Sequence, residues 1–212
     1  MPRKGRVVVV DGQDMFRDLL VRVCETELNC EVMGVAKTGG AGLDLIKAQD
    51  PDIVLLDSHL SDMNGYVLME IFKQACRAPR FLLVSGCCNA GTVHRVMQSR
   101  VAGFVDKETS TVAMLREAVV AVLAGQSYFC ARFESIWRSQ LNPANSPFKI
   151  LSPWECQILA QIAQCKTDQE IGLALGIAPR TVKTHRSNLL RKLSIKSSLK
   201  LVAFGLSFGF AE

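Results

Sequence analysis

Five short apolar runs, separated by amphipathic stretches, fill the first 125 residues and constrain the fold more than any other feature. The runs are continuous in Val, Ile and Leu instead of alternating with polar residues, which is typical of strands covered on both faces. Strands are expected at Arg6–Val10, Cys30–Ala36, Ile53–Leu56, Phe81–Val84 and Gly103–Val105. Helices are expected at Met15–Leu28, Gly40–Gln49, Tyr66–Gln74, Thr92–Arg100 and Thr111–Ala124. This alternation predicts a doubly wound, parallel five-stranded α/β sheet with right-handed crossovers.

The remainder of the chain has a different pattern and predicts a second, all-helical domain. A stretch rich in Asn and Pro interrupts the alternation, and its first part, ARFESIWRSQL, predicts a short helix. Beyond it, Ser152 with Glu155 and Thr167 with Glu170 have the spacing of capping boxes, which mark helix starts. We therefore predict three parts: a first domain at 1–128, a linker at 129–149 and a four-helix domain at 150–212.

Positive charge is concentrated in the predicted helical domain. The chain has a formal net charge of +5, and residues 150–212 contribute +4 of it, from 8 Lys/Arg and 4 Asp/Glu. No acidic residue lies between Glu170 and Glu212. Such an asymmetry is expected where one end of a chain meets a polyanion, although a single basic residue is usually only solvated.

The apolar runs and the cysteines favour a reduced, cytoplasmic protein. No run approaches the roughly 18–20 apolar residues that cross a bilayer, and the N-terminal run, Val7 to Val10, is too short for a signal peptide. The cysteines show no CxxC spacing, so we expect reduced, mostly buried thiols and no zinc site. The eight are Cys24, Cys30, Cys76, Cys87, Cys88, Cys130, Cys156 and Cys165.

Polar residues follow four of the predicted strands at the point where each ends. Asp11 follows the first strand, Asp57 the third, Ser85 the fourth and Lys107 the fifth. Because the carboxyl ends of parallel strands meet at one edge of a sheet, we expect these side chains to lie close together. Two carboxylates, a hydroxyl and an ammonium suit a phosphoryl group together with Mg²⁺, which prefers oxygen ligands.

The segments PDIVLLDSHLSDMNG, VSG and GFVDK resemble the phosphoacceptor, switch and lysine motifs of receiver domains. The resemblance implies that Asp57 accepts a phosphoryl group from a sensor histidine kinase. It implies that Mg²⁺ is held by Asp11, Asp57 and the main-chain carbonyl of His59. It assigns phosphate contact or the conformational switch to three further residues, Ser85, Lys107 and the aromatic Phe104.

One position departs from this resemblance. Receivers usually carry two adjacent acidic residues after the first strand, whereas here Asp11 is followed by Gly12. The missing carboxylate removes one oxygen ligand and one negative charge, so Mg²⁺ is expected to bind weakly. Asp14 lies where the first helix begins, and we expect it to act as a cap. Two hypotheses stay open: phosphorylation of Asp57 controls the protein, or a degenerate receiver serves only dimerisation or protein interaction.

A helix expected to start near Arg180 has two chemically opposite sides. At about 100° per residue, the buried side is formed by Val182, Leu189, Leu190 and Leu193. The opposite side combines cations, hydroxyls and an amide, which offer phosphate contacts and hydrogen bonds to base edges. Its members are Arg180, Lys183, Thr184, Ser187, Asn188 and Arg191. The preceding helix, expected at Asp168–Leu175, ends at Gly176 in a short turn, as in a helix-turn-helix.

The stretch from LSPWECQILA to SSLKLVAF resembles the four-helix DNA-binding domain of NarL/FixJ-type, or LuxR-like, regulators. The resemblance implies that Lys183, Thr184 and Ser187 face the major groove of double-stranded DNA. It assigns phosphate contacts to four basic residues, Arg180, Arg191, Lys192 and Lys196. Arg186 falls toward the buried side of its helix, where we expect its aliphatic stem to pack.

These features predict a DNA-binding transcriptional response regulator of a two-component system, with Mg²⁺ as cofactor. Its expected partners are double-stranded DNA, a sensor histidine kinase and a second copy of the chain. The last helix, expected at about Ser198–Phe208, is the predicted contact between two DNA-binding domains. We expect no metabolic enzyme, because the sequence has no glycine-rich phosphate loop and no credible Ser/His/Asp or Cys/His set.

Overall fold

The computed structural model describes residues 3–72, 78–141 and 146–210. The chain forms two compact units, one made of residues 1–88 and 96–134 and the other of residues 89–95 and 135–212. The first unit therefore includes a short segment beyond residue 128, where the sequence places the end of the first domain.

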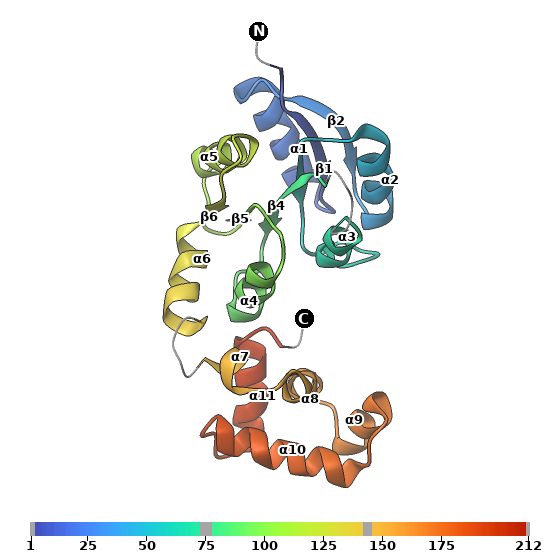
Figure 1. Cartoon of the computed structure of the whole chain (residues 1–212), viewed down its shortest axis with the longest axis vertical. Helices are drawn as coiled ribbons and strands as arrows, with labels where there is room; N and C mark the ends of the chain where they lie inside the picture. Colours follow the sequence, from blue (N-terminus) through green and yellow to red (C-terminus); the bar gives the residue numbers. More distant parts are fainter. Residues whose placement is uncertain (1–2, 73–77, 142–145, 211–212) are drawn as a thin grey trace. The chain divides into compact units, whose positions relative to one another are not determined.

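A parallel sheet with strand order β2-β1-β3-β4-β5-β6 forms the centre of the first unit (Figure 1). The strands are β1 (Arg6–Val10), β2 (Glu31–Ala36), β3 (Ile53–Leu56), β4 (Arg80–Ser85), β5 (Gly103–Asp106) and β6 (Tyr128–Phe129). All neighbouring strands run parallel. The predicted doubly wound α/β fold is confirmed, and the first five strands begin and end within one residue of the expected bounds.

The predicted number of five strands was too low. The sixth, β6, is only two residues long and pairs with Gly103 and Phe104 of β5. It follows Gly125, whose φ of +90° lets the chain turn after α5 (Val112–Leu123). Two residues are too few to form a recognisable apolar run, so the sequence pattern gave no sign of this edge strand.

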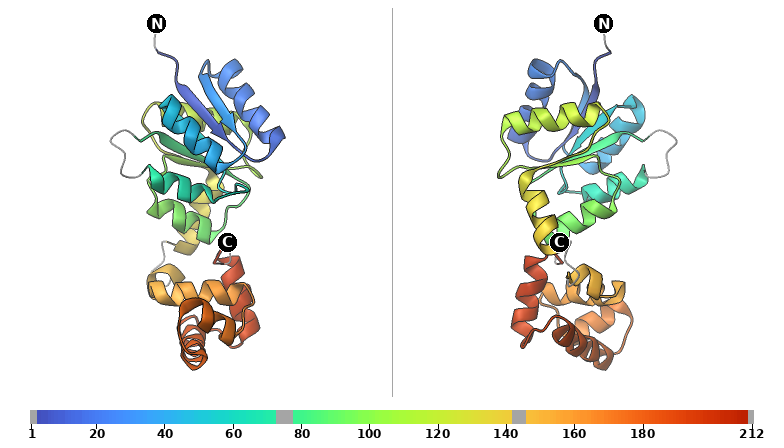
Figure 2. Two further views of the ribbon diagram at one scale, coloured as in Figure 1. Left: turned by 90° about the vertical axis from the view of Figure 1, so that its right-hand side faces the viewer. Right: turned by 60° about the vertical axis from the view of Figure 1, so that its left-hand side comes forward.

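Helices cover both faces of the sheet (Figure 2). Besides α5, the helices of the chain before residue 142 are α1 (Asp14–Arg22), which continues as the π-helical turn η1 (Val23–Glu27), α2 (Gly39–Gln49), α3 (Gly65–Ile71), α4 (Ala90–Gln98) and α6 (Ala131–Ile136), which continues as η2 (Trp137–Leu141). The first part of α4 and η2 belong to the second unit. On one face, Leu20 of α1 and Val119 of α5 pack in one core with Val9. Burial on both faces explains the continuous apolar runs, since Val7–Val10 are all 0% exposed. The last residues of the predicted helix Tyr66–Gln74 lie outside the described residues.

The second unit contains the predicted helical domain. Its helices from residue 147 onward are α7 (Pro147–Ile150), α8 (Pro153–Ala163), α9 (Asp168–Leu175), α10 (Pro179–Lys192) and α11 (Ser198–Ser207). Both predicted capping boxes are present, with the Ser152 and Thr167 hydroxyls each accepting from the backbone N–H three residues on. The α8–α11 helices enclose an apolar core that includes Ile158, Val182 and Leu201. The Asn- and Pro-rich residues 142–145 of the predicted linker lie outside the described residues.

The cysteines follow the prediction in part. Four of the seven described ones are buried, but Cys165 is exposed, and Cys76 lies outside the described residues. None of the seven is in a disulfide. Burial raises the pKa of Cys24 to about 12, which keeps that thiol protonated. Across the described parts of the chain, no helix combines the length and the apolar character needed to cross a membrane.

Candidate functional site

Three charged side chains meet at the carboxyl edge of the sheet. Lys107 Nζ lies 2.8 Å from Asp11 Oδ2 and 2.7 Å from Asp57 Oδ2. All three side chains are almost fully buried, with exposed fractions of 5% for Lys107, 0% for Asp11 and 6% for Asp57. The ammonium also lies 4.7 Å from the centre of the Phe16 ring, a cation–π contact. One buried cation thus contacts two buried carboxylates, so the negative charges exceed the positive charge by one.

The sheet backbone holds these residues in place. Asp57 donates its N–H to the carbonyl of Val10 at 2.8 Å, and Lys107 donates its own to the carbonyl of Ser85 at 2.9 Å. The start of α3 lies against the end of β3, because a Cβ at Gly65 would be only 2.4 Å from the Asp57 carbonyl oxygen. Glycine is therefore required at position 65, where the backbone of α3 approaches the end of β3.

Asp11 is a buried carboxylate with one oxygen that only the Lys107 ammonium approaches among the described side chains. Burial raises the pKa of Asp11 above its usual value, while Lys107 and the N–H of Gln13 oppose the shift. Oδ1 accepts a hydrogen bond from the Gln13 N–H at 2.8 Å. Oδ2 is buried and has no aligned hydrogen-bond donor, although the Lys107 ammonium is close to it. A buried carboxylate oxygen with an unused lone pair is a suitable ligand for a hard cation.

The remaining candidate ligands supply oxygen as well. Asp57 Oδ1 accepts a hydrogen bond from the His59 N–H at 3.0 Å, which places the His59 backbone beside the carboxylate. In the part of the chain that is described, no three His, Cys, Asp or Glu side chains gather as a ligand cluster. Two carboxylates and a carbonyl nevertheless fit Mg²⁺, which commonly uses one or two carboxylates and keeps several waters.

The position that lacks the second acidic residue has room for a side chain. A Cβ added at Gly12 would meet only the carbonyl oxygen of Lys37, at 3.6 Å, an ordinary van der Waals contact. The expected capping role of Asp14 was wrong, because the N-cap of α1 is Gln13 and has no side-chain cap bond. The Asp14 carboxylate instead pairs with Arg17 and, at 2.9 Å, with Lys37.

Ser85 belongs to a chain of hydrogen bonds that sequence reasoning did not find. Its hydroxyl lies 2.6 Å from the hydroxyl of Ser58, which in turn lies 2.8 Å from Nδ1 of His59. The backbone N–H of Cys87 donates to Ser85 Oγ at 3.1 Å. Ser85 and Ser58 are 0% and 1% exposed, whereas His59 is exposed. Ser58 directly follows Asp57, and nothing in its sequence context suggests a contact with β4.

Phe104 lies on β5 with its side chain fully buried. Its ring centre is 5.2 Å from that of Phe133 on α6, which stacks on Phe129 of β6 at 4.8 Å. Next along β5, the buried Asp106 carboxylate accepts from Arg132 of α6 at 3.0 Å. The sequence offered only the short helix predicted at this segment, and neither contact could be derived from it.

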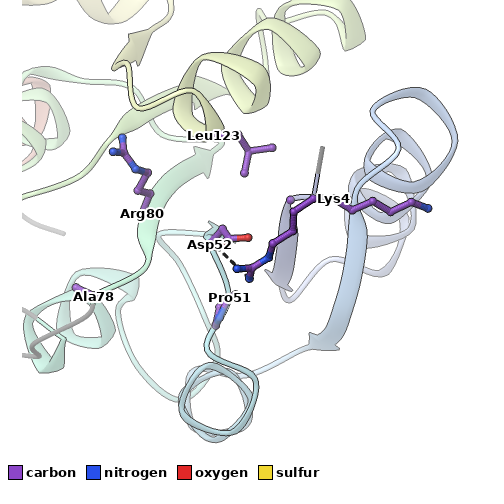
Figure 3. Close-up of a pocket in the computed structure, with 8 residues that line it drawn as sticks. Lys4, Pro51, Asp52, Ala78, Arg80 and Leu123 are labelled. Atoms are coloured by element: carbon purple, nitrogen blue, oxygen red, sulfur yellow. Dashed lines mark ion pairs between the residues drawn. The ribbon is translucent and has the colours of Figure 1, made fainter. Parts of the chain in front are cut away.

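A cavity of about 460 Å³ lies away from this site, at the end of the sheet where the strands begin (Figure 3). Its lining includes the cations Arg3, Lys4 and Arg80 together with Asp52. Arg3 pairs with Asp52 at 3.6 Å, and Lys4 extends away from the other labelled side chains (Figure 3). Among the described residues that line the cavity, one of the three cations is thus already paired with a carboxylate.

The α10 helix has the two predicted sides. Val182 and Leu189 are fully buried, and Leu190 and Leu193 are half-buried. The opposite side is exposed at Arg180, Lys183, Thr184, Ser187 and Arg191 and half-buried at Asn188. Two hydroxyls on this side, those of Thr184 and Ser187, donate to the carbonyls four residues earlier at 3.1 Å, as exposed Ser and Thr often do in helices.

Two basic residues near this surface have partners inside the domain. The Arg186 guanidinium is held by one carboxylate oxygen of Asp168 on α9, at 2.6 and 3.0 Å, so it turns away from the exposed side. Lys192 Nζ lies 2.7 Å from Glu155 Oε2 of α8. Lys196, beyond the end of α10, is exposed. The ion pair of Lys192 therefore competes with the phosphate contact that the sequence resemblance assigns to it.

Glycines set the angle between α9 and α10. Gly176 ends α9 with φ +67°, in the left-handed region that favours glycine. A Cβ at Gly172 would lie 2.6 Å from the carbonyl oxygen of Ile177, so the turn packs directly on the α9 backbone. This close approach produces the helix-turn-helix that presents α10.

Comparisons with known proteins agree with this geometry. Residues 7–119 match the model for the response regulator receiver domain, and residues 149–204 match the model for bacterial regulatory proteins of the luxR family. The probable transcriptional regulatory protein NarL of Mycobacterium tuberculosis is 30% identical over 203 residues, covering 95% of this chain and 94% of that protein. The solved receiver domain of the putative NarL from the same organism is 34% identical with a TM-score of 0.56, and covers 59% of this chain and 100% of that one. RcsB of Salmonella enterica serovar Typhimurium, solved bound to a promoter with a phosphomimetic, shares the fold with a TM-score of 0.70 at 16% identity, covering 98% of this chain and 100% of that one.

Proposed function

Because this chain belongs to the two-component response regulators that join a receiver domain to a LuxR-type DNA-binding domain, we propose that phosphorylation of Asp57 controls its binding to double-stranded DNA. The observation that carries the proposal is the contact of one buried ammonium, that of Lys107, with both Asp11 and Asp57. Such a cation can stabilise the negative charge that a phosphoryl group brings to the site.

The proposed chemistry is transfer of a phosphoryl group from a histidine of a sensor kinase. An Asp57 carboxylate oxygen forms a bond to phosphorus while the bond from phosphorus to the kinase histidine nitrogen breaks. Lys107 pairs with the phosphoryl oxygens and the Ser85 hydroxyl donates a hydrogen bond to one of them. Asp11, Asp57 and the His59 main-chain carbonyl would hold Mg²⁺, which when bound neutralises negative charge on the phosphoryl oxygens.

The proposed DNA-binding surface is the exposed side of α10. Lys183, Thr184 and Ser187 would read base edges in the major groove, because they lie together on that side. Phosphate contacts would come from Arg180, Arg191 and Lys196, and Asn188 lies near them on the same side of the helix. Lys192 would contribute a phosphate contact only if its ion pair with Glu155 breaks. Two copies would bind paired half-sites in the cytoplasm, with α11 between them.

Acetyl phosphate with Mg²⁺, followed by intact-mass measurement, tests the phosphoacceptor. The expected result is one added phosphoryl group on the full chain and none on Asp57→Asn. DNA selected from a random pool by the chain should then bind more tightly after phosphorylation. An unmodified chain under saturating donor, together with unchanged DNA binding, would support the alternative of a degenerate receiver, which Gly12 alone favours.

A further inference from the structure

The hydroxyls of Ser58 and Ser85 form a short, buried hydrogen bond. Their oxygens are 2.6 Å apart, and the two residues are 1% and 0% exposed. Ser58 comes from the loop after β3 and Ser85 from the end of β4, so the bond joins two neighbouring strand ends. A hydrogen bond between two buried hydroxyls restricts the rotation of both side chains.

The neighbouring groups indicate which hydroxyl is the donor. Ser85 Oγ already accepts from the N–H of Cys87 at 3.1 Å. Ser58 Oγ lies 2.8 Å from Nδ1 of His59, which accepts when the ring carries its proton on Nε2. If Ser85 donates to Ser58, and Ser58 donates to His59, each hydroxyl donates once and accepts once. In the opposite direction, the acceptor left for the Ser85 proton among the described residues is the Cys87 carbonyl at 3.5 Å, which is poorly placed.

We propose that Ser58 is a positioning residue that holds the Ser85 hydroxyl in the resting state of the receiver. The inference rests on the proposed function, in which the Ser85 hydroxyl donates a hydrogen bond to a phosphoryl oxygen on Asp57. With Ser85 as the donor to Ser58, its hydroxyl is occupied by a bond of 2.6 Å, so the bond between the two serines has to break before Ser85 can contact the phosphoryl group. Ser58 therefore opposes activation and raises the donor concentration at which the receiver switches.

Binding of beryllofluoride, a phosphoryl mimic, to the full chain with Mg²⁺ tests this role without a covalent step. Bound fluoride is followed by ¹⁹F NMR in wild type, Ser58→Ala and Ser61→Ala. Ser58→Ala removes one oxygen and is expected to tighten binding about five-fold, the size of one net hydrogen bond. Ser61→Ala makes the same change at an exposed serine on the same loop and is expected to leave binding unchanged.

Repeating the measurement in a Ser85→Ala variant shows whether Ser58 acts through the Ser85 hydroxyl or by changing the shape of its loop. Ser85→Ala keeps Asp57 and Lys107 and is expected to bind beryllofluoride at higher concentration. In this background Ser58→Ala should have no further effect, because Ser58 acts through the Ser85 hydroxyl. A five-fold effect that persists without that hydroxyl would overturn the inference.

The remaining outcomes also decide the question. If wild type binds beryllofluoride but Ser58→Ala binds equally or more weakly, the inference fails while the proposed function stands. Weaker binding would mean that the Ser58 hydroxyl itself contacts the phosphoryl group. If wild type shows no bound fluoride at saturation, the proposed function fails and the inference falls with it.

Discussion

A carboxylate added at position 12 is expected to strengthen Mg²⁺ binding at the receiver site. The structure can accept the change Gly12→Asp without strain, because an added Cβ meets nothing closer than the Lys37 carbonyl oxygen at 3.6 Å and the backbone is outside the left-handed region. The buried Oδ2 of Asp11 already lacks an aligned donor. The new carboxylate would therefore add negative charge beside the oxygens of Asp11 and Asp57, which we propose as Mg²⁺ ligands.

The magnitude follows from the charges present. Asp11 and Asp57 carry two negative charges against the single positive charge of Lys107. A third carboxylate about 5 Å from a dication, at an effective dielectric constant of about 20, gains roughly 6–7 kcal/mol of Coulomb energy. The desolvation of the new carboxylate and its repulsion from the two existing carboxylates reduce this Coulomb gain by several kcal/mol. We expect a net gain of about 1.5–3 kcal/mol, which is roughly ten- to hundred-fold tighter binding.

Isothermal titration of Mg²⁺ into the full chain measures this gain, and Gly12→Asn is the matched control of the same shape without the charge. The asparagine variant is expected to stay close to wild type. Without Mg²⁺, Gly12→Asp should unfold at lower urea concentration than wild type, because Lys107 then faces three carboxylates. Equal gains for the two variants, or no gain for aspartate, would refute the argument that Gly12 weakens the site by removing a charge.

Four further substitutions test other parts of the structure. Lys183→Ala should alter the sequence selected from a random DNA pool, whereas Lys196→Ala should weaken all sites alike and lower the salt slope by about 1. Burial opposes ionisation of Glu155, but its bonds to Lys192 and to the Ser152 end of α8 lower its pKa overall. The free energy of unfolding that this carboxylate contributes is therefore fully present above pH 4.5, its usual pKa, and is lost as the pH falls through the lowered pKa of the folded state. In urea unfolding measured against pH, Glu155→Gln should reduce this pH-dependent part of the stability by about 1 kcal/mol. Gly172→Ala should destabilise the helical unit by about 1–3 kcal/mol in thermal unfolding, because its Cβ would lie 2.6 Å from a backbone oxygen.

The long elements of the fold could be predicted because their sequence pattern is strong. The continuous run Val7–Val10 marks a strand that is buried on both faces, and the structure gives it the expected bounds. The capping spacing of Thr167 and Glu170 placed the start of α9, and Gly176 its end. The short β6 was missed because two residues carry no periodicity, and its place in the sheet depends on pairing with β5.

The site was predictable only where residues stand at strand ends. Asp57 and Lys107 are fifty residues apart, but parallel strand order alone brings their ends to one edge. The partner of Lys192 could not be predicted, because Glu155 lies on α8 and already has a capping role that gave no reason to expect a cation. The contact of Ser58 with Ser85 was missed for a similar reason. A serine after a strand is usually solvated, and only its burial at 1% exposure singles it out.

The side chains of β5 alternate between the two faces of the sheet, so this strand contributes to a different set of contacts on each face. Successive side chains on a strand point to opposite faces. Val105 therefore joins the core under α1 and α5, while Phe104 and Asp106 point to the other face, toward Phe133 and Arg132. Lys107 directly follows this strand and pairs with Asp57. A shift of one residue in the pairing of β4 with β5 would turn Asp106 toward the apolar core and move Lys107 away from Asp57. The register of β5 therefore determines both the charged site and the contacts of this strand with α6.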